Sequence, residues 1–280
     1  MWRRRWVRRM TGPYGVGIGW RPEIAGFVAE LPGLRFVEVV AEGVSPTDPP
    51  DGLVELRRRG VTVVPHGVRL SLGGTDPVEP ARVGHLAAVA ELLAAPLVSE
   101  HIAFVRAGGL EAGHLLPLPR TREAVDVVCA NVARARADLP VPIALEPIAA
   151  LFDWPDDELD EATFLTEILD RTDALLLLDI ANVHANARNR GTDPLALLDR
   201  LPLDRVAYVH VAGGADHGGF YHDTHTDPVS QDVLDLLAEL CARHRPPAVM
   251  LERDGHYPPA ADLRAELDAI ATASGLPVVT

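Results

Sequence analysis

The sequence of 280 residues contains no lysine, so all 26 of its cationic side chains are arginines. It contains only two cysteines, Cys129 and Cys241, which fall inside predicted helices and have no CxxC spacing. This scarcity of cysteine argues against a disulfide framework, and a reducing cytoplasm is the compartment that fits. Any metal site in the chain must therefore be built from nitrogen and oxygen ligands.

The sequence also lacks the patterns of a membrane protein or a nucleic-acid-binding protein. No apolar stretch reaches the roughly 18 residues that a membrane helix needs, and the formal net charge of −14 disfavours nucleic acid as a partner. The basic segment 1–12 has no apolar region behind it, so it is not a secretory signal. We expect a disordered extension there and one domain over 13–280, with contact to a membrane surface or a partner as the alternative for the extension.

Short apolar runs alternate with amphipathic helical patterns along the whole chain. The runs predict strands near 15–20, 36–42, 61–67, 97–104, 143–148, 174–183, 206–213 and 248–254. The helical patterns lie at 77–95, 120–138, 160–171, 228–244 and 260–274, with a weak one at 50–60 and a short one at 193–200. Asp160 and the pair Asp193-Pro194 are typical of helix starts.

Eight strands alternating with helices predict an α/β protein with a parallel sheet, and we favour a single (β/α)8 TIM barrel. The length is suitable, because such barrels have about 250 residues. An open doubly wound sheet is disfavoured, since no GxGxxG turn follows an early strand and polar residues end many strands. We expect the glycine-rich stretches 105–119 and 214–222 to lie at the rim as candidate lids.

Five of the predicted strands end in a carboxylate or an imidazole. Charged groups are almost never placed in buried strands unless they are paired or coordinated. Several such ends in succession therefore predict one shared site at the C-terminal rim of the barrel. The candidate ligands are His66, His101, Glu146, Asp179, Asn182, His210 and Glu252, with Asp223 and His225 in the loop after the seventh strand.

Strand periodicity sorts the neighbours within this set. Glu100 and His101 are adjacent, and successive strand side chains point to opposite faces. We therefore place His101 in the site and give Glu100 a supporting role. Asp179 is out of phase with Asn182 and His184 unless the strand ends between them. We keep Asp179 and Asn182 as candidate site residues and leave the role of His184 open.

The donor types and their number predict the kind of metal site. Carboxylates and imidazoles without thiolates suit Fe(II), Mn(II) or Zn(II). Each such ion takes about four to six ligands, so the candidate set is too large for one ion. Glu146 is the expected bridge, because a carboxylate can hold two ions roughly 3.5–4 Å apart. The alternative for each residue alone is a rim histidine or an ion pair with arginine.

Several phrases of the sequence, in this order, resemble one known family. They are HGVRLSLGG, SEHIAF, GHLLPLP, LEP, LLDIANVHANA, HVAGG, DTHTDPV and LERDG, within residues 66–255. The chain resembles the DUF692 family of multinuclear non-heme iron-dependent oxidases, which includes the methanobactin biosynthesis oxidase. The resemblance covers about residues 15–258, and the joint match of eight ordered phrases is far more specific than any one of them.

The resemblance implies a xylose-isomerase-like TIM barrel that holds two or three iron ions in mixed Fe(II)/Fe(III) states and uses O2 as co-substrate. It implies oxidation of a ribosomally synthesised precursor peptide, most often at a cysteine, with a separate partner protein that binds the leader. It places the predicted ligands in the metal shell and Glu146, Asp223 and His225 at the reacting centre. One departure is Pro147, because many family members have asparagine there, and this leaves substrate details open.

Other metal-dependent barrels are the alternative. A sugar isomerase of the xylose isomerase type or a phosphodiesterase of the endonuclease IV type also places histidines and acids at strand ends. The net charge of −14 disfavours the nuclease, because a DNA-binding face needs basic clusters. The characteristic central lysine of the isomerase cannot be present, since the chain has no lysine.

Overall fold

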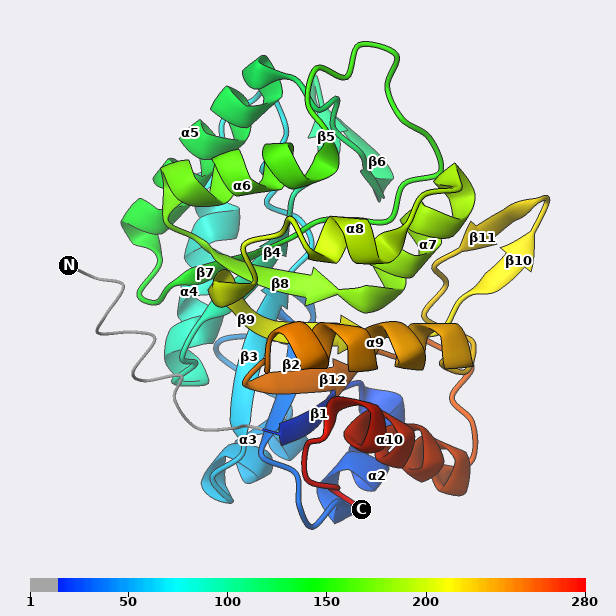
Figure 1. The fold of residues 1–280 in the computed structure, drawn as a ribbon. Coiled ribbons are helices and arrows are strands. Elements are labelled where there is room, and N and C mark those ends of the chain that lie inside the picture. Colours follow the sequence, from blue (N-terminus) through cyan, green and yellow to red (C-terminus); the bar gives the residue numbers. More distant parts are fainter. Residues whose placement is uncertain (1–14) are drawn as a thin grey trace.

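The computed structural model describes residues 15–280, and a closed barrel of eight parallel strands lies at its centre (Figure 1). The predicted extension 1–12 lies outside the described residues. The strands follow one another around the barrel in the order β1, β2, β3, β4, β7, β8, β9 and β12. Their bounds are β1 Gly15–Gly19, β2 Phe36–Val40, β3 Thr62–Gly67, β4 Val98–His101, β7 Ile143–Glu146, β8 Leu175–Asp179, β9 Val206–Val211 and β12 Ala248–Leu251.

Helices surround the barrel, and the predicted (β/α)8 architecture is confirmed. Those of the described residues are α2 Ala25–Glu30, α3 Asp51–Arg58, α4 Pro80–Leu92, α5 Arg122–Asp138, α6 Glu161–Thr172, α7 Ile180–Arg190, α8 Pro194–Leu198, α9 Gln231–Arg243 and α10 Ala260–Ser274, with 3-10 turns at Pro22–Ile24, Ala41–Gly43 and Leu203–Arg205. Asp160 and Asp193 cap α6 and α8 as predicted, because their carboxylates accept from the amides of Thr163 and Leu195. None of the helices in residues 15–280 has the length and apolar content that a membrane crossing requires.

Two predicted strands were too long. The chain 174–183 changes from strand to helix at Asp179, whose carboxylate accepts from the amide of Asn182 at 3.0 Å and so caps α7. An apolar run continues across this junction, so hydrophobicity alone did not reveal the helix start. The chain 97–104 leaves the barrel after His101, where it turns into a separate hairpin.

Two antiparallel hairpins extend from the C-terminal ends of the barrel strands. The stretch 105–119 contains most of the hairpin of β5 Phe104–Ala107 and β6 Leu110–Leu116, and 214–222 forms that of β10 Ala215–His217 and β11 Phe220–His222. Each turns through two glycines with positive φ, at 108–109 and at 218–219, a backbone that glycine adopts without strain. Figure 1 shows β10 and β11 projecting from the body of the molecule.

The apolar core has two parts, on either side of the barrel wall. Outward-facing side chains such as Val37 and Val209 pack under the helices, while Phe36, Leu177, Tyr208 and Met250 belong to a second cluster that fills the barrel interior. Interior side chains recur every two residues, so the next inward position on each strand lies one layer nearer its C-terminal end. A second interior layer, made of polar side chains, therefore lies next to the apolar layer on the side of the C-terminal strand ends.

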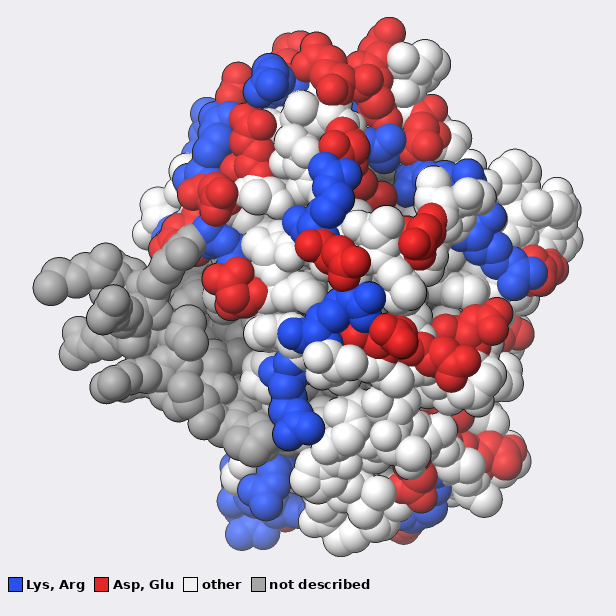
Figure 2. Space-filling view, in the orientation of Figure 1, with Lys and Arg blue, Asp and Glu red and all other residues white. Residues whose placement is uncertain are grey.

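On the face shown in Figure 2, arginine and acidic side chains of the described residues are interspersed rather than gathered into a broad basic surface. Many of them are paired, as Arg243 is with Asp199 at 2.6 Å and with Glu239 at 2.6 Å. Exposed pairs of this kind contribute little to stability, about 0–1 kcal/mol each. The buried charges at the strand ends are different, because burial of a charge requires a partner or a bound ion.

Candidate metal centre

The polar layer at the C-terminal end of the barrel interior is almost wholly buried. Strand alternation brings His66, Glu146, Asp179 and His210 to this layer, each two residues after an apolar interior position. Glu252 follows β12 in the same phase, and all five are less than 10% exposed. So many ionisable groups with so little water require mutual neutralisation or bound cations.

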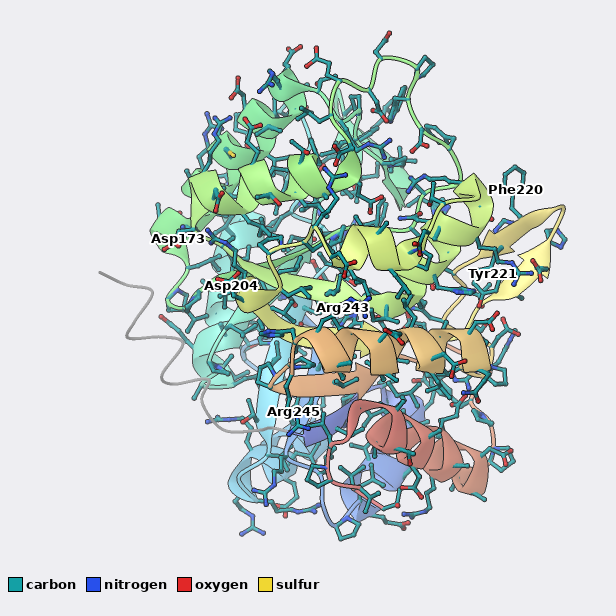
Figure 3. All side chains as sticks on the ribbon, viewed as in Figure 1. Asp173, Asp204, Phe220, Tyr221, Arg243 and Arg245 are labelled. Carbon is teal, nitrogen blue, oxygen red and sulfur yellow. The ribbon has the colours of Figure 1, made fainter. Side chains whose placement is uncertain are left out.

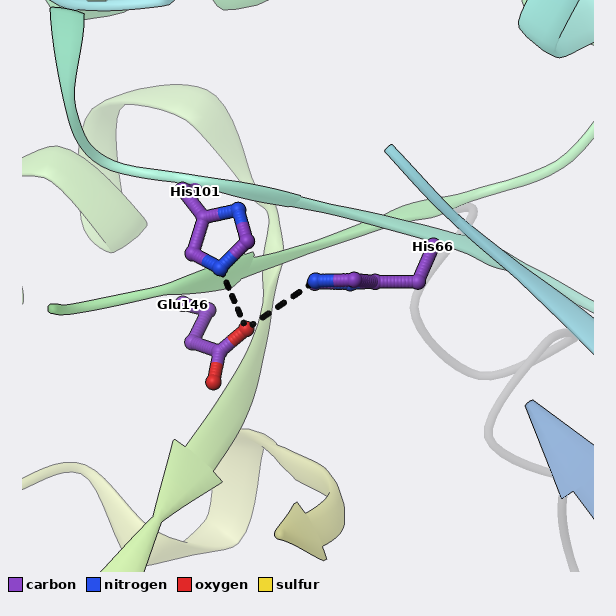
Figure 4. Close-up of side chains that lie close together, drawn as sticks. All are labelled: His66, His101 and Glu146. Atoms are coloured by element: carbon purple, nitrogen blue, oxygen red, sulfur yellow. Dashed lines mark ion pairs between the residues drawn. The ribbon is translucent and has the colours of Figure 1, made fainter. Parts of the chain in front are cut away.

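The first group of potential ligands joins three strands. Nε2 of His66 and Nε2 of His101 lie 3.5 Å and 3.3 Å from the same oxygen of Glu146, its Oε2 (Figure 4). The three side chains come from β3, β4 and β7, and their ligand atoms lie within 4.8 Å of one another. Two imidazole nitrogens converging on one carboxylate oxygen form a set that a divalent ion of the Fe, Mn or Zn kind accepts.

The second group shares Glu146 with the first. The other oxygen of Glu146, Oε1, lies 3.2 Å from Nδ1 of His210, and that nitrogen is 2.8 Å from Oε2 of Glu252. Asp179 completes this group. Glu146 therefore presents one oxygen to each group, which is the geometry of a bridging carboxylate.

Two further groups overlap at His225, nearer the mouth of the barrel. Nε2 of His225 lies 2.7 Å from Asp223 and 3.8 Å from Asp179, while Nδ1 lies 3.3 Å from Glu252 and 3.5 Å from Asp254. His225 has a φ of 54°, a left-handed backbone that is uncommon for histidine and aims its ring toward these acids. The structure thus brings eight of the nine predicted ligands into one set of overlapping groups.

The centre contains polar atoms that have no hydrogen-bond partner within the described structure. They include Oε2 of Glu146, Oδ2 of Asp179 and Oδ1 of Asp223, all buried. Buried acceptors are nearly always satisfied in folded proteins. Unpartnered carboxylate oxygens that face imidazole nitrogens fit the requirements of bound cations. Eight of the predicted ligands therefore lie where cations could be held, and their role as ligands stays a prediction.

The electrostatics of the metal-free centre show how strongly these groups interact. Burial alone would lower the pKa of His101, but Glu146 and Glu100 outweigh it and raise that pKa to about 9. Burial raises the pKa of Asp179 to about 7, and the neighbouring charge of Asp223 contributes. The pKa of Glu252 lies well below its ordinary value despite burial, because His210 and His225 stabilise the carboxylate. Without a cation, protons on the imidazoles and on Asp179 would balance these acids.

The remaining predicted residues lie around these groups. Asn182 is on the first turn of α7, where its side-chain amide donates to the carbonyl of Pro147 at 3.2 Å and its Oδ1 is buried without a partner. His184 lies elsewhere, with its ring 5.0 Å from that of Tyr221. Glu100 lies behind His101, accepting from the amides of Leu70 and His101. The role of Asn182 as a ligand remains a prediction.

Sequence reasoning missed two acids that the structure places at the centre. Glu38 on β2 is fully buried, and its Oε2 lies 2.9 Å from Nε2 of His210. Its signal was an acid inside the β-branched run FVEVV, away from the strand end. Asp254, two residues after Glu252, contacts His225 and also accepts from Arg21 at 2.6 Å. Nothing in the sequence indicated that Arg21 and Asp254 meet, because this contact depends on closure of the barrel between β1 and β12.

Metal binding should therefore stabilise the protein. We expect 1 mM Zn(II) or Fe(II), the latter without oxygen, to raise the Tm of chelator-treated protein by at least about 5 °C. A ligand at a thousand times its Kd stabilises by roughly 4 kcal/mol, and 1 kcal/mol shifts Tm by roughly 2–4 °C in a protein of 150–250 residues. Differential scanning fluorimetry is the measurement, with Mg(II) as the control that prefers oxygen-rich sites. An unchanged Tm with Zn(II) and Fe(II) would contradict the metal assignment.

The closed barrel of eight parallel strands defines the fold class, the TIM barrels, and solved structures share it. D-psicose 3-epimerase from Clostridium cellulolyticum superposes with a TM-score of 0.62 at 13% identity, covering 93% of this chain and 99% of the epimerase. Endonuclease IV from Thermus thermophilus gives 0.59 at 19% identity, covering 92% and 98%. A xylose isomerase domain protein from Salmonella typhimurium gives 0.59 at 14%, covering 94% and 97%. At these identities the likeness confirms the xylose-isomerase-like barrel alone.

The family is established by sequence. The RiPP precursor modification enzyme family MbnB/TglH/ChrH matches residues 15–274, and the chain belongs to it. A UPF0276 protein of Streptomyces avermitilis is 55% identical over 269 residues, which cover 94% of this chain; the chain spans about half of that relative, 55% of its length. A UPF0276 protein of Caulobacter vibrioides is 37% identical, covering 91% of this chain and 92% of the relative. The resemblance to DUF692 is thereby confirmed.

Proposed function

We propose that this protein is a multinuclear iron-dependent oxidase that uses O2 to modify a cysteine, or another residue, of a ribosomally synthesised precursor peptide. The observation that carries the proposal is the bridging position of Glu146, whose two oxygens face two adjacent groups of nitrogen and oxygen ligands. Membership of a RiPP precursor modification family supports a peptide as the substrate class. Adjacent ions held without thiolates fit iron, which suits multi-electron oxidation better than a single redox-inert ion.

The proposed ligand assignment follows the groups. His66, His101 and Glu146 would hold one ion, and Glu146, Asp179, His210 and Glu252 a second. Asp179, Asp223 and His225 would hold a third, with Asn182 beside them. Bound iron would supply one-electron chemistry with O2. Two or three mixed-valence ions are thus the proposed cofactor.

The proposed roles of the residues at the centre depend on how deeply each side chain is buried in the barrel. Glu146 is buried between the first two groups and would keep their ions at a constant separation. Asp223 and His225 are 10% and 15% exposed at their side chains, whereas Asp179 is fully buried, so we expect an entering peptide to meet this side of the centre, next to the exposed Asp254. Their 2.7 Å contact holds the imidazole ring in one orientation. The apolar layer below excludes water from the opposite side.

Metal analysis and oxygen consumption together test the proposal. The protein is purified anaerobically from iron-supplemented cells, its metals are counted by elemental analysis, and O2 uptake is followed with a cysteine-containing peptide encoded beside its gene. The expected result is more than one iron per chain and uptake that depends on the peptide. One zinc or manganese per chain without iron uptake would instead favour the isomerase or phosphodiesterase class. A separate leader-binding partner is also proposed, and full-rate modification by this chain alone would refute that part.

An exposed aromatic on the β10–β11 hairpin provides a prediction about peptide binding. Phe220 is 46% exposed and points away from the hairpin, whereas Tyr221 faces the body of the molecule (Figure 3). Asn189 of α7 anchors the hairpin by exchanging two hydrogen bonds of 2.8 Å with the backbone of Tyr221.

We expect Phe220→Ala to raise the KM for the peptide roughly 5- to 20-fold with unchanged iron content, because an aromatic anchor at an interface contributes about 1–2 kcal/mol. Val54→Ala, which shortens an exposed side chain of α3, is the matched control. Steady-state kinetics with the precursor peptide measures the effect. Lost iron in Phe220→Ala would show that the hairpin supports the centre, and an unchanged KM would remove Phe220 from the binding surface.

A further inference from the structure

A chain of hydrogen bonds runs beneath the candidate metal centre and links two of its histidines. Nδ1 of His66 lies 2.8 Å from the hydroxyl of Ser99, which is 2.7 Å from the hydroxyl of Tyr208. The Tyr208 hydroxyl donates to Oε2 of Glu38, and the same oxygen lies 2.9 Å from Nε2 of His210. All five side chains are at most 2% exposed. None of the three intervening residues belongs to the ligand groups described above.

Counting donors gives each link one direction. As a carboxylate, Glu38 can only accept, so His210 must donate from Nε2 and Tyr208 must donate from its hydroxyl. Tyr208 then has no proton left for Ser99, so Ser99 donates to the oxygen of Tyr208. The oxygen of Ser99 is left to accept from Nδ1 of His66. Four links use four protons, and every donor has one acceptor.

The two histidines would therefore carry their protons on opposite nitrogens. A proton on Nδ1 of His66 leaves the lone pair of Nε2 directed at Glu146 and the first ligand group. A proton on Nε2 of His210 leaves the lone pair of Nδ1 directed at Glu146 and Glu252 in the second group. Hydrogen bonding at one ring nitrogen determines which nitrogen is free to bind a metal.

We propose that Glu38, Tyr208 and Ser99 are positioning residues that fix opposite tautomers of His66 and His210, so that His66 binds metal through Nε2 and His210 through Nδ1. The proposal rests on the metal centre of the proposed function but is independent of iron and of oxidation. The carboxylate of Glu38 sets the direction of every hydrogen bond in the series, from His210 and Tyr208 through Ser99 to His66. Substitution of Glu38, Tyr208 or Ser99 should therefore affect metal binding in both ligand groups, which Glu146 also joins.

The direct test is nitrogen NMR of the Zn(II)-loaded protein with 15N-labelled histidine. Long-range proton–nitrogen correlations distinguish protonated from metal-bound ring nitrogens, and spectra of His66→Gln and His210→Gln assign the two rings among the 11 histidines. The expected result is protonated Nδ1 in His66 and protonated Nε2 in His210. The reverse tautomer in either ring would overturn the proposal.

Variants test the linkage without relying on activity. Tyr208→Phe keeps the ring that packs against Phe36 but removes the hydroxyl, so Ser99 loses its acceptor and can donate to His66 instead. We expect a second His66 tautomer in the spectra and a 10- to 100-fold weaker Zn(II) affinity by chelator competition, the usual range for removing such support. Ser99→Ala should weaken affinity similarly, and the double variant should be little worse than either alone. Tyr257→Phe is the matched control, because it removes the same hydroxyl from a half-buried tyrosine that lies outside the ligand groups.

The outcomes separate this proposal from the proposed function. Zn(II) binding with the expected tautomers but no iron uptake or oxygen consumption would refute the oxidase and leave the tautomer assignment standing. Oxidase activity with unchanged spectra and Zn(II) affinity in Tyr208→Phe and Glu38→Gln would refute the assignment and leave the oxidase standing. Failure of the wild-type protein to bind any divalent metal would overturn both.

Discussion

Glu146→Gln should reduce metal content in two ligand groups at once and lower the proposed peptide oxidation by at least about 100-fold. The substitution preserves shape but replaces one oxygen of a carboxylate that faces His66 and His101 on one side and His210 on the other. Among residues 15–280, Glu146 is the one acid that faces both the first and the second group, so no neighbouring acid can replace it as a bridge. Elemental analysis and mass spectrometry of the peptide measure the two effects.

Glu91→Gln is the matched control for Glu146→Gln, since it removes the same charge from an exposed position near the end of α4. It should retain full iron content and activity. A Glu146→Gln protein that keeps its full iron complement would contradict the bridging role, even if activity fell.

Asp179→Asn is expected to have opposite effects on activity and on the stability of the metal-free protein. Asparagine can still cap α7 through the oxygen that accepts from the amide of Asn182, so the helix start is preserved. The neutral side chain is a poor ligand for the second and third groups that share Asp179. Metal affinity and oxidation should therefore fall at least about 10- to 100-fold.

The effect of Asp179→Asn on stability depends on pH. Burial, reinforced by Asp223, raises the pKa of Asp179 to about 7, so the folded metal-free protein favours the protonated form. The stabilisation from this proton is complete below the unfolded-state pKa of about 4 and is lost as pH rises through 7. We expect metal-free Asp179→Asn to match the wild type near pH 4 and to exceed its Tm by several degrees above pH 7.

Thermal melts of chelator-treated protein across this pH range measure the difference. Asp193→Asn is the control, because Asp193 caps α8 in the same way but is exposed and lies outside the ligand groups. A Tm difference between Asp179→Asn and wild type that does not grow with pH would contradict the role of burial at Asp179.

Much of the candidate site was predictable because strand ends are simple to find in a sequence. An apolar run that stops at an acid or imidazole specifies both the strand and the rim position of the residue, as with His66, Glu146 and His210. Alternation also indicated that His101, rather than Glu100, faces the interior. Asp179 was found for the same reason, although the strand predicted around it was too long.

Residues that depend on contacts between distant strands were not predictable. Glu38 lies in the middle of β2, and only closure of the barrel brings it to His210, which is 172 positions away along the sequence. The ion pair of Arg21 with Asp254 likewise requires β1 to pair with β12. Local patterns carry no information on such partners, because the distance between two side chains in a barrel depends on strand order and register.

The sequence by itself therefore determined the barrel class, the nitrogen and oxygen character of the candidate centre, most of the residues gathered there and, by resemblance, the family. These follow from hydrophobic periodicity, from residue type and from ordered motifs, which are local properties. Only the tertiary structure decided how the ligands divide into groups, that Glu146 faces two of them, and that Glu38, Tyr208 and Ser99 connect His66 to His210. The physical reason is that coordination and hydrogen bonding depend on atomic distances of about 3 Å, which are set when the eight strands close into one barrel.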